Sequence, residues 1–254
     1  MSVLLSDLDH GLLTLTFNRP ERANAFNLEL IAALQEALRR AEKDENVRCV
    51  LLMGNGRAFG AGQDLEEILA AAGTSIREHL QHTYNPLILQ IRRLEKPVLA
   101  AIHGACAGAS LGVALACDLR LAAAGTRFVV GFNGIGLAPD SGVSLLLPLL
   151  IGLGRATWFT WSNEPFSAEQ ALEWGIVQKV VPAEELSEAA RAVARQLIEG
   201  PQKAFALTKR AFNRAVLPHL EAILDYEAHL QDVAARDAEH AQRVRLFLER
   251  RKSG

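Results

Sequence analysis

One carboxylate stands inside a long apolar stretch, where Asp140 follows Pro139 in GLAPDSGVSLLLPLL. Burial among apolar side chains disfavours the charged form of a carboxyl group and raises its pKa, which suits it to accept and return a proton near neutral pH. Asp140 could instead cap a helix, because Asp is a preferred N-cap residue and an apolar run follows. The residues by themselves leave both interpretations open.

Two glycine-rich segments could present backbone N–H groups to a ligand. Gly60-Ala61-Gly62 has side chains small enough for a ligand to approach the main chain closely. Gly108-Ala109 stands where a helix is expected to begin, and the first N–H groups of a helix have no partner within it. Two such amides aimed at one oxygen would form an oxyanion hole, whereas either segment on its own could be an ordinary tight turn.

A second chemistry comes from Gly108-Ala109-Ser110-Leu111-Gly112, which matches the GxSxG pattern of a serine hydrolase. Asp140 and one of the later histidines, His219, His229 or His240, would complete a triad in the right order. The strand expected before this motif ends near Ile102, six residues too early for a nucleophile elbow. The hydrolase is therefore the rival hypothesis.

Composition excludes several other classes. The 254 residues carry 27 Lys+Arg and 29 Asp+Glu, a net charge of −2, which argues against nucleic-acid binding. The glycine-rich loop around residues 54–62 has neither the GK[ST] of a phosphate-binding loop nor the glycine pattern of a dinucleotide-binding fold. His79 and His82 are not accompanied by the carboxylates that would indicate a metal site. Three cysteines without a CxxC pair and an N-terminus without a basic signal region predict a soluble cytoplasmic protein with neither metal nor separate cofactor.

A stretch of twenty residues without a formal charge, Val98 to Cys117, raises the question of a membrane helix. Gly104, Gly108 and Gly112 lie in it at GxxxG spacing. Lys96-Pro97 precedes the stretch, which is mostly Ala and Gly. We therefore predict a strand that turns at Gly104 and leads into a buried helix, and no membrane association.

The chain reads as α/β over residues 1–198, followed by a helical region over 199–254. The expected elements are a strand at Leu12–Phe17, a helix capped by Asn27 and running to Lys43, a strand in VRCVLLM, a helix from Ile76 to Leu94, a strand in DLRLAAA, a helix with a capping box at Ser167–Gln170, and helices from Glu184 onward.

Several segments in the same order resemble the crotonase (enoyl-CoA hydratase/isomerase) superfamily: NRPERANAFN, GRAFGAGQDL, KPVLAAIHGACAGASLGVALACDLRLAA, GLAPDSG and LTKRAF…FLERRK. The resemblance implies an α/β crotonase-like spiral of strand–strand–helix repeats carrying the active site, with the C-terminal helices used for trimerisation. It implies an acyl-CoA thioester as substrate, coenzyme A being part of that substrate, and a homotrimer or a hexamer built as a dimer of trimers.

The resemblance also assigns roles to residues. The amides of Ala61 and Ala109 are expected to hold the thioester oxygen and to stabilise the enolate formed from it. The acyl group is expected to lie near residues 70–85. The residues expected to border the substrate and its CoA moiety are Arg22, Ala23, Ala25, Gly62, Gln63, Asp64, Leu65 and Gly108, with Lys209 and Phe247 from the tail.

Two departures from the family decide the expected reaction. Members that add water to a double bond use two glutamates, and the matching places here hold Gly112 and Phe132. One acid/base group, Asp140, remains, and isomerases of the family carry a single carboxylate at that place. One carboxylate can move a proton along a dienolate without net addition of water. The Pro-Asp pair with LLP after it resembles members of the family that convert an arene epoxide to an oxepin, so the resemblance implies an isomerase with that reaction or one that shifts the double bond of a 3-enoyl thioester.

Three alternatives remain open at this point. The first is a hydratase that activates water through another group. The second is a dehalogenase-like enzyme in which Asp140 is the nucleophile. The third is a protein that binds acyl-CoA without catalysis.

Overall fold

The computed structural model describes residues 2–70 and 75–252, and its main feature is a six-stranded sheet. The strands run in the order β1-β2-β3-β4-β6-β9; β1 is antiparallel to β2 and each later pair is parallel. The strands of this sheet are Leu4–Asp9 (β1), Leu12–Phe17 (β2), Cys49–Gly54 (β3), Val98–Ile102 (β4), Leu119–Ala123 (β6) and Lys179–Val181 (β9). A second sheet joins Ala105–Ala107 (β5), Arg127–Val129 (β7) and Phe166–Ser167 (β8).

Helices alternate with the strands and then continue without them to the C-terminus. They are Leu28–Lys43 (α1), Leu65–Ala70 (α2), Ile76–His82 (α3), Tyr84–Arg93 (α4), Ala109–Ala116 (α5), Val143–Ile151 (α6), Leu153–Ser162 (α7), Ala168–Glu173 (α8), Leu186–Glu199 (α9), Gln202–Val216 (α10), Leu220–Ala235 (α11) and Ala238–Lys252 (α12). Short 3₁₀ turns span Pro20–Arg22, Asn133–Ile135 and Ala183–Glu185.

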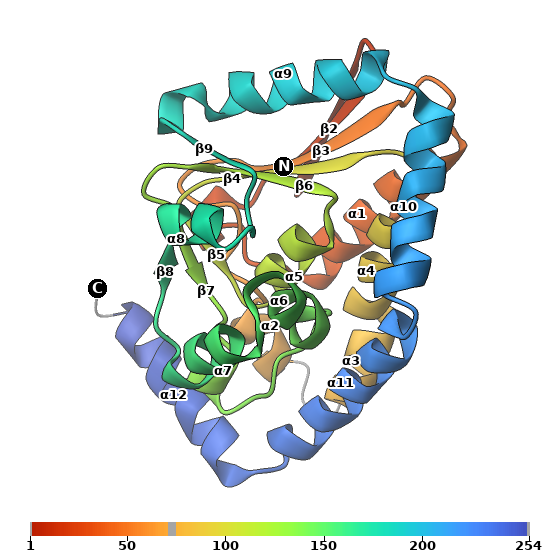
Figure 1. The fold of residues 1–254 in the computed structure, drawn as a ribbon. Helices are drawn as coiled ribbons and strands as arrows, with labels where there is room; N and C mark the ends of the chain where they lie inside the picture. The colour runs from red at the N-terminus through yellow and green to blue at the C-terminus, as the bar shows by residue number, and fades with distance from the viewer. Residues whose placement is uncertain (1, 71–74, 253–254) are drawn as a thin grey trace.

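The large sheet is covered on both faces, as Figure 1 shows. The apolar side of α9, with Leu186, Ala190 and Ala194, packs on one face, and α1, α4 and α5 lie against the other. Parallel strands between two helical layers have both faces buried, which accounts for continuous apolar runs such as Cys49–Gly54. The fold is therefore α/β with a helical C-terminus, as predicted.

Most of the expected elements are confirmed, including two caps. Asn27 accepts a hydrogen bond from the Leu30 N–H at 3.0 Å, and Ser167 and Gln170 form the capping box. The helix expected from Ile76 to Leu94 is wrong as a single element, because the backbone leaves helical geometry at Thr83, whose hydroxyl donates to the His79 carbonyl. The described residues contain no helix long and apolar enough to cross a membrane.

Gly104 is the point at which the chain leaves the large sheet. It has a φ of +62°, and a Cβ there would lie 1.9 Å from the carbonyl oxygen of Arg57, so only glycine fits. The turn starts the second sheet with β5, which the sequence analysis did not predict. Backbone bonds between Gly60 and Ala105–Ala107 then bring the two glycine-rich loops side by side.

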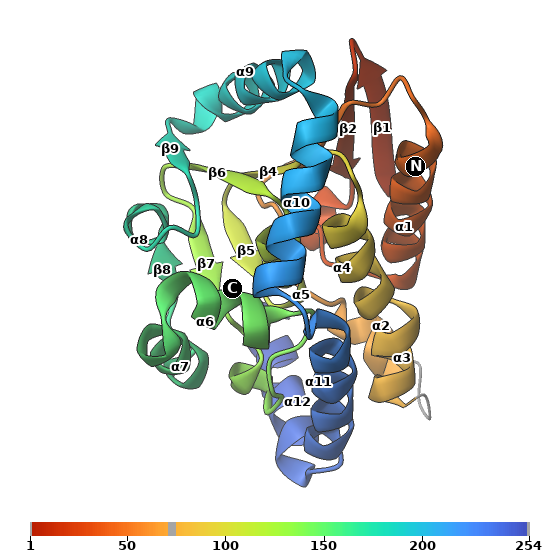
Figure 2. The same cartoon turned by 45° about the vertical axis from the view of Figure 1, so that its right-hand side comes forward.

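The C-terminal helices run along the outside of the core, as Figure 2 shows for α10 and α11. Lys209 anchors α10 through its bond to Asp118, at 2.7 Å. The last helix, α12, returns to the 3₁₀ turn Asn133–Ile135, where the His240 ring contacts the Ile135 carbonyl at 2.7 Å. The region 199–254, expected to serve oligomerisation, therefore also contacts the segment that leads to Asp140.

Candidate active site

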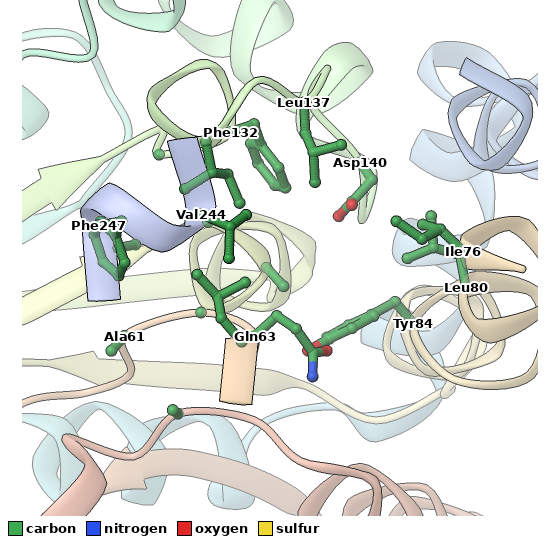
Figure 3. Close-up of a pocket in the computed structure, with 18 of the residues that line it drawn as sticks. Ala61, Gln63, Ile76, Leu80, Tyr84, Phe132, Leu137, Asp140, Val244 and Phe247 are labelled. Atoms are coloured by element: carbon green, nitrogen blue, oxygen red, sulfur yellow. The ribbon is translucent and has the colours of Figure 1, made fainter. Parts of the chain in front are cut away.

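A pocket with a cavity of about 130 Å³ lies where the two glycine loops, the segment 131–140 and α12 meet. Figure 3 shows Asp140 on one side and Gln63 and Tyr84 on another, with Phe132, Leu137 and Val244 around the space between them. The remaining wall is mostly apolar and comes from α3 and α4 through Ile76, Leu80 and Tyr84. Part of the range 70–85, expected to lie near the acyl group, therefore lines this pocket, and residues 71–74 lie outside the described residues.

The amide of Ala109 is placed as predicted. Ala109 is the first residue of α5 and lines the pocket, and its N–H has no acceptor among the residues that the structure describes. Such a group at the positive end of a helix attracts a developing negative charge.

The amide of Ala61 requires a correction. Its N–H already donates to the Ala23 carbonyl at 3.1 Å, so it is not free to hold a substrate oxygen. In the same loop the Gly62 carbonyl accepts from the Phe26 N–H at 2.7 Å. A trans peptide points its C=O and N–H in opposite directions, so the Gln63 N–H points away from Phe26. It has no acceptor within the described chain, and Gln63 lines the pocket.

Sequence reasoning missed the role available to the Gln63 amide because small residues mark a loop but not the direction of each N–H. The direction of the Gln63 N–H follows from the short parallel bridge between Phe26 and Gln63. In this bridge Phe26 bonds the Gly62 carbonyl and the Asp64 N–H, so the N–H of Gln63 itself faces the opposite side. The amides of Gln63 and Ala109 are thus the unpartnered pair that best fits an oxyanion.

Asp140 is buried, with 7% of its surface exposed. One carboxylate oxygen, Oδ1, accepts from the Ser141 hydroxyl at 2.7 Å, and Oδ2 accepts from the Gln231 amide at 2.5 Å. Burial raises the pKa of Asp140 to about 6, and these two hydrogen bonds oppose the rise. Helix α6 begins at Val143 after Gly142, so the Asp140 side chain does not cap it.

The two positions at which the resemblance expects the glutamates of water-adding enzymes, 112 and 132, offer no acid here. Phe132 lines the pocket with an apolar ring. A Cβ on Gly112 would lie 2.5 Å from the Ser141 carbonyl oxygen and 2.6 Å from the Ser141 Cβ. The segment that carries Asp140 therefore occupies the room that a glutamate at 112 would need. Asp140 is the only carboxylate among the described residues that line the pocket.

Across the pocket from Asp140, Gln63 is bonded by polar side chains of α3 and α4. The Tyr84 hydroxyl donates to Gln63 Oε1 at 2.7 Å, and His79 Nε2 lies 3.3 Å from the same oxygen. Burial lowers the pKa of His79, which favours its neutral form. These contacts fix the Gln63 side chain beside its unpartnered backbone N–H.

The remaining predicted substrate-binding residues fall into three groups. Those that line the pocket are Ala25, Gly62, Leu65, Gly108 and Phe247. Those that flank it have structural bonds: the Ala23 carbonyl accepts from Ala61, Asp64 pairs with Arg19 at 2.9 Å, and Arg22 pairs with Glu66 at 2.7 Å. The prediction for Lys209 is not supported, because its buried amine pairs with Asp118 and it does not line the pocket.

The serine-hydrolase hypothesis is wrong. Ser110 is fully buried, and its hydroxyl oxygen lies 2.6 Å from the Gly60 carbonyl and 2.8 Å from the Ala107 carbonyl, so its single proton is engaged by one or the other. His219 and His229 are exposed, and the ring of His240 contacts Ile135 instead. Ser110 is therefore a bridge between the two loops of the site. The described residues also contain no group of three or more His, Cys, Asp or Glu that could hold a metal ion.

Comparison with known proteins gives one consistent result. The family model described as enoyl-CoA hydratase/isomerase matches residues 7–254. The 1,2-epoxyphenylacetyl-CoA isomerase of Escherichia coli is 40% identical, over 99% of this chain and 97% of that protein. The trans-2-decenoyl-(acyl-carrier-protein) isomerase of Streptococcus mutans is 34% identical, over 98% and 96%. The crystal structure of an enoyl-CoA hydratase from Mycobacterium avium subsp. paratuberculosis superimposes with a TM-score of 0.89 at 33% identity, covering 98% and 96% of the two chains.

Proposed function

The chain belongs to the enoyl-CoA hydratase/isomerase, or crotonase, family of enzymes that act on CoA thioesters, and we propose that it is an isomerase that works through a thioester enolate. The observation that carries this proposal is that one buried carboxylate, Asp140, lines the same pocket as Gln63 and Ala109, whose backbone N–H groups have no acceptor in the described part of the chain. A hydratase of the usual kind needs a second carboxylate, and the space for it at Gly112 is taken by Ser141.

In the proposed mechanism the thioester oxygen accepts hydrogen bonds from the Gln63 and Ala109 N–H groups. Asp140 removes a proton from the α-carbon, and the two amides stabilise the negative charge that moves onto the oxygen. Asp140 then returns the proton to an atom further along the conjugated system, so the double bond moves and the composition is unchanged. A carboxyl with a pKa of about 6 is suited to both steps near neutral pH.

For the acyl group we propose an epoxyphenylacetyl thioester converted to an oxepin, with a 3-enoyl thioester as the second candidate. The 40% identity to a 1,2-epoxyphenylacetyl-CoA isomerase supports the first. The cavity does too, because about 130 Å³ is close to the roughly 150 Å³ of an apolar cavity that holds one benzene ring. The apolar side chains of Ile76, Leu80 and Phe132 suit such a ring.

Coenzyme A would enter as part of the substrate, past Ala25, Leu65 and Phe247 at the pocket. The assembly into a homotrimer, or a hexamer of two trimers, stays a prediction. Exposed apolar side chains on α7, including Leu153, Trp158 and Trp161, offer surface that such an assembly would cover.

The test is a product analysis with three substrates: a 3-enoyl-CoA, a 2-enoyl-CoA and enzymatically prepared epoxyphenylacetyl-CoA. Ultraviolet absorbance would follow conversion and mass spectrometry would give the product mass. An isomerase gives a product of unchanged mass, and the faster of the two isomerisable substrates identifies the acyl class. A product heavier by one water from the 2-enoyl-CoA would overturn the proposal in favour of a hydratase.

A further inference from the structure

The carboxylate of Asp140 is held by a residue more than ninety positions later in the chain. Gln231, on α11, donates from Nε2 to Asp140 Oδ2 at 2.5 Å and to the Ala138 carbonyl at 2.7 Å. Gln231 is fully buried, and its Oε1 has no hydrogen-bond partner among the residues that the structure describes. Turning the amide over would set Oε1 against two acceptor oxygens, so the donor orientation of Gln231 is fixed by the groups around it.

Glu227, one turn before Gln231 on α11, bonds the same segment, residues 138–144. Its two carboxylate oxygens accept from the Gly142 N–H at 2.8 Å and the Ser144 N–H at 3.0 Å. The side chain is buried, and burial raises its pKa to about 7 against the opposing effect of these hydrogen bonds. Residues 227 and 231 share one face of the helix, because i and i+4 lie above one another. The segment is thus held before Asp140, at its carboxylate and after it.

The segment needs such support because its backbone is not in a favoured conformation. Ser141 has a φ of +56° and Gly142 a φ of +78°, two successive left-handed residues. A non-glycine residue in that region is strained by about 1 kcal/mol or more and keeps the conformation only where its surroundings impose it. The contacts from α11 are the ones that bracket these two residues.

We propose that Gln231 and Glu227 are positioning residues that hold Asp140 in its reactive orientation, which makes α11 part of the catalytic apparatus. This inference rests on the proposed role of Asp140 as the base. It assigns the C-terminal region a function inside its own subunit, in addition to any part in assembly.

The two residues act differently on the proton that Asp140 carries. The Gln231 amide can only donate at Nε2, so it favours the charged carboxylate. The Ser141 hydroxyl can reverse its direction and accept when Asp140 is protonated. The other titratable groups around Asp140 are Glu227 on α11, Tyr84 on α4, and the pocket-lining histidines of α3 and α12, His79 and His240. Loss of the Gln231 donor should therefore raise the pKa of Asp140.

The test measures enolate formation directly, by exchange of the α-protons of phenylacetyl-CoA for deuterium in D₂O, followed by mass spectrometry across a pH series. Asp140 would take up an α-proton, exchange it with solvent and return a deuteron. Gln231→Met keeps the length of the side chain and removes the donor, and Gln231→Glu keeps the shape and adds a negative charge. The expected exchange rate of Gln231→Met at high pH is roughly 10- to 100-fold below wild type.

The acid limb of the profile separates positioning from a merely structural role. We expect its midpoint to rise by roughly one pH unit in Gln231→Met and further in Gln231→Glu, because a like charge adds to the lost donor. Glu227→Gln, which keeps one acceptor, should lower the rate less than Glu227→Leu. A fall in rate with an unmoved midpoint in both Gln231 variants would overturn the inference, as would rates equal to wild type.

The matched control is Asn85→Leu. Asn85 is a buried amide that also bonds α11, donating to the Leu224 carbonyl at 3.0 Å, but it does not line the pocket. Its loss should lower the thermal midpoint without moving the pH midpoint of exchange. If the wild type itself neither exchanges phenylacetyl-CoA nor isomerises any of the three substrates, the proposed function fails, and this inference with it. Exchange in the wild type that is unaltered by Gln231→Met overturns the inference only.

Discussion

Two walls of the pocket carry the proposed catalytic groups, one through backbone N–H groups and the other through a side-chain carboxylate. The wall of Gln63 and Ala109 presents backbone N–H groups whose directions are set by neighbouring main-chain bonds, such as Phe26 to Gly62 and Gly60 to Ala105. The wall of Asp140 presents one side chain on a strained turn, fixed by side chains of α11. The first wall is held by main-chain hydrogen bonds to Phe26 and to β5. The second is held by a helix whose contacting side chains follow Asp140 in the chain by about ninety residues.

This difference predicts different sensitivities to mutation. The amide wall should tolerate side-chain changes that leave the backbone in place, because no side chain supplies the hydrogen bond. The acid wall should respond to changes at Asp140, and at the residues that orient it. The predictions below test that contrast, beginning with the largest expected effect.

Asp140→Asn should lower kcat by about 10²- to 10⁴-fold, because the variant keeps the shape but loses the only carboxylate among the described pocket-lining residues. Binding of a non-reactive CoA ester, measured by calorimetry, should change little, since the amides and the pocket are kept. Turnover at the wild-type rate would show that Asp140 is not the base.

Ala109→Pro should lower kcat/KM by about 10²- to 10³-fold, the usual effect of losing one oxyanion donor. Proline is well tolerated at the first position of a helix, where its missing N–H has no partner in the helix, and Ala109 starts α5 after a glycine. The proline Cδ would also occupy the place of the N–H hydrogen and keep the substrate oxygen away, which lowers kcat/KM further.

Leu153→Pro is the control for that variant. Leu153 starts α7, also after a glycine, and its side chain is 73% exposed. Leu153 also lies on the apolar surface of α7 named above, so the comparison is made at an assembly state shown by gel filtration to be unchanged, and there Leu153→Pro should keep wild-type kinetics. Equal kinetics for Ala109→Pro and Leu153→Pro would remove Ala109 from the proposed oxyanion hole.

The pH profile of kcat/KM should fall on its acid side with a midpoint near 6, because Asp140 acts as base in its charged form and its pKa is about 6. One pH unit below the midpoint the rate should be about a tenth of its plateau. The raised value comes from burial, so the midpoint should move little with salt. A midpoint near 4, the ordinary value of a carboxyl group, would mean that Asp140 is solvated in the working enzyme.

The sequence predicted the acid wall better than the amide wall. An isolated carboxylate in an apolar run is visible in one dimension, and Asp140 lies where that pattern indicated. The N–H that faces the pocket depends on which backbone groups the neighbouring strand uses, and for that reason Ala61 was predicted where Gln63 has the free amide.

Contacts between distant segments escaped prediction for the same reason. Local patterns gave β2, β3, β4 and β6 of the large sheet, the caps at Asn27 and Ser167, and the turn at Gly104, but none of the strands of the second sheet. Nothing local to α11 indicates that Gln231 bonds Asp140, because the two meet only in the folded chain. The break at Thr83, by contrast, had a local signal that the prediction overlooked: Pro86 has no N–H to donate to the His82 carbonyl, so it breaks a continuous helix but fits the first turn of α4.

The smallest predicted effect lies where the two walls touch. Gly112 on α5 is in the helix that carries Ala109, and a Cβ there would press on the backbone of Ser141, next to Asp140. Gly112→Ala should therefore destabilise the fold by about 1–3 kcal/mol, as overpacking does, and lower kcat several-fold by shifting Asp140. Gly154→Ala is the matched control, because a Cβ on Gly154 in α7 meets no atom of the described residues within 4 Å. Thermal unfolding and kcat should separate the two variants. If Gly112→Ala were as stable and active as Gly154→Ala, the turn at Ser141 would be able to move away from the new Cβ. The fold would then no longer exclude a glutamate at position 112.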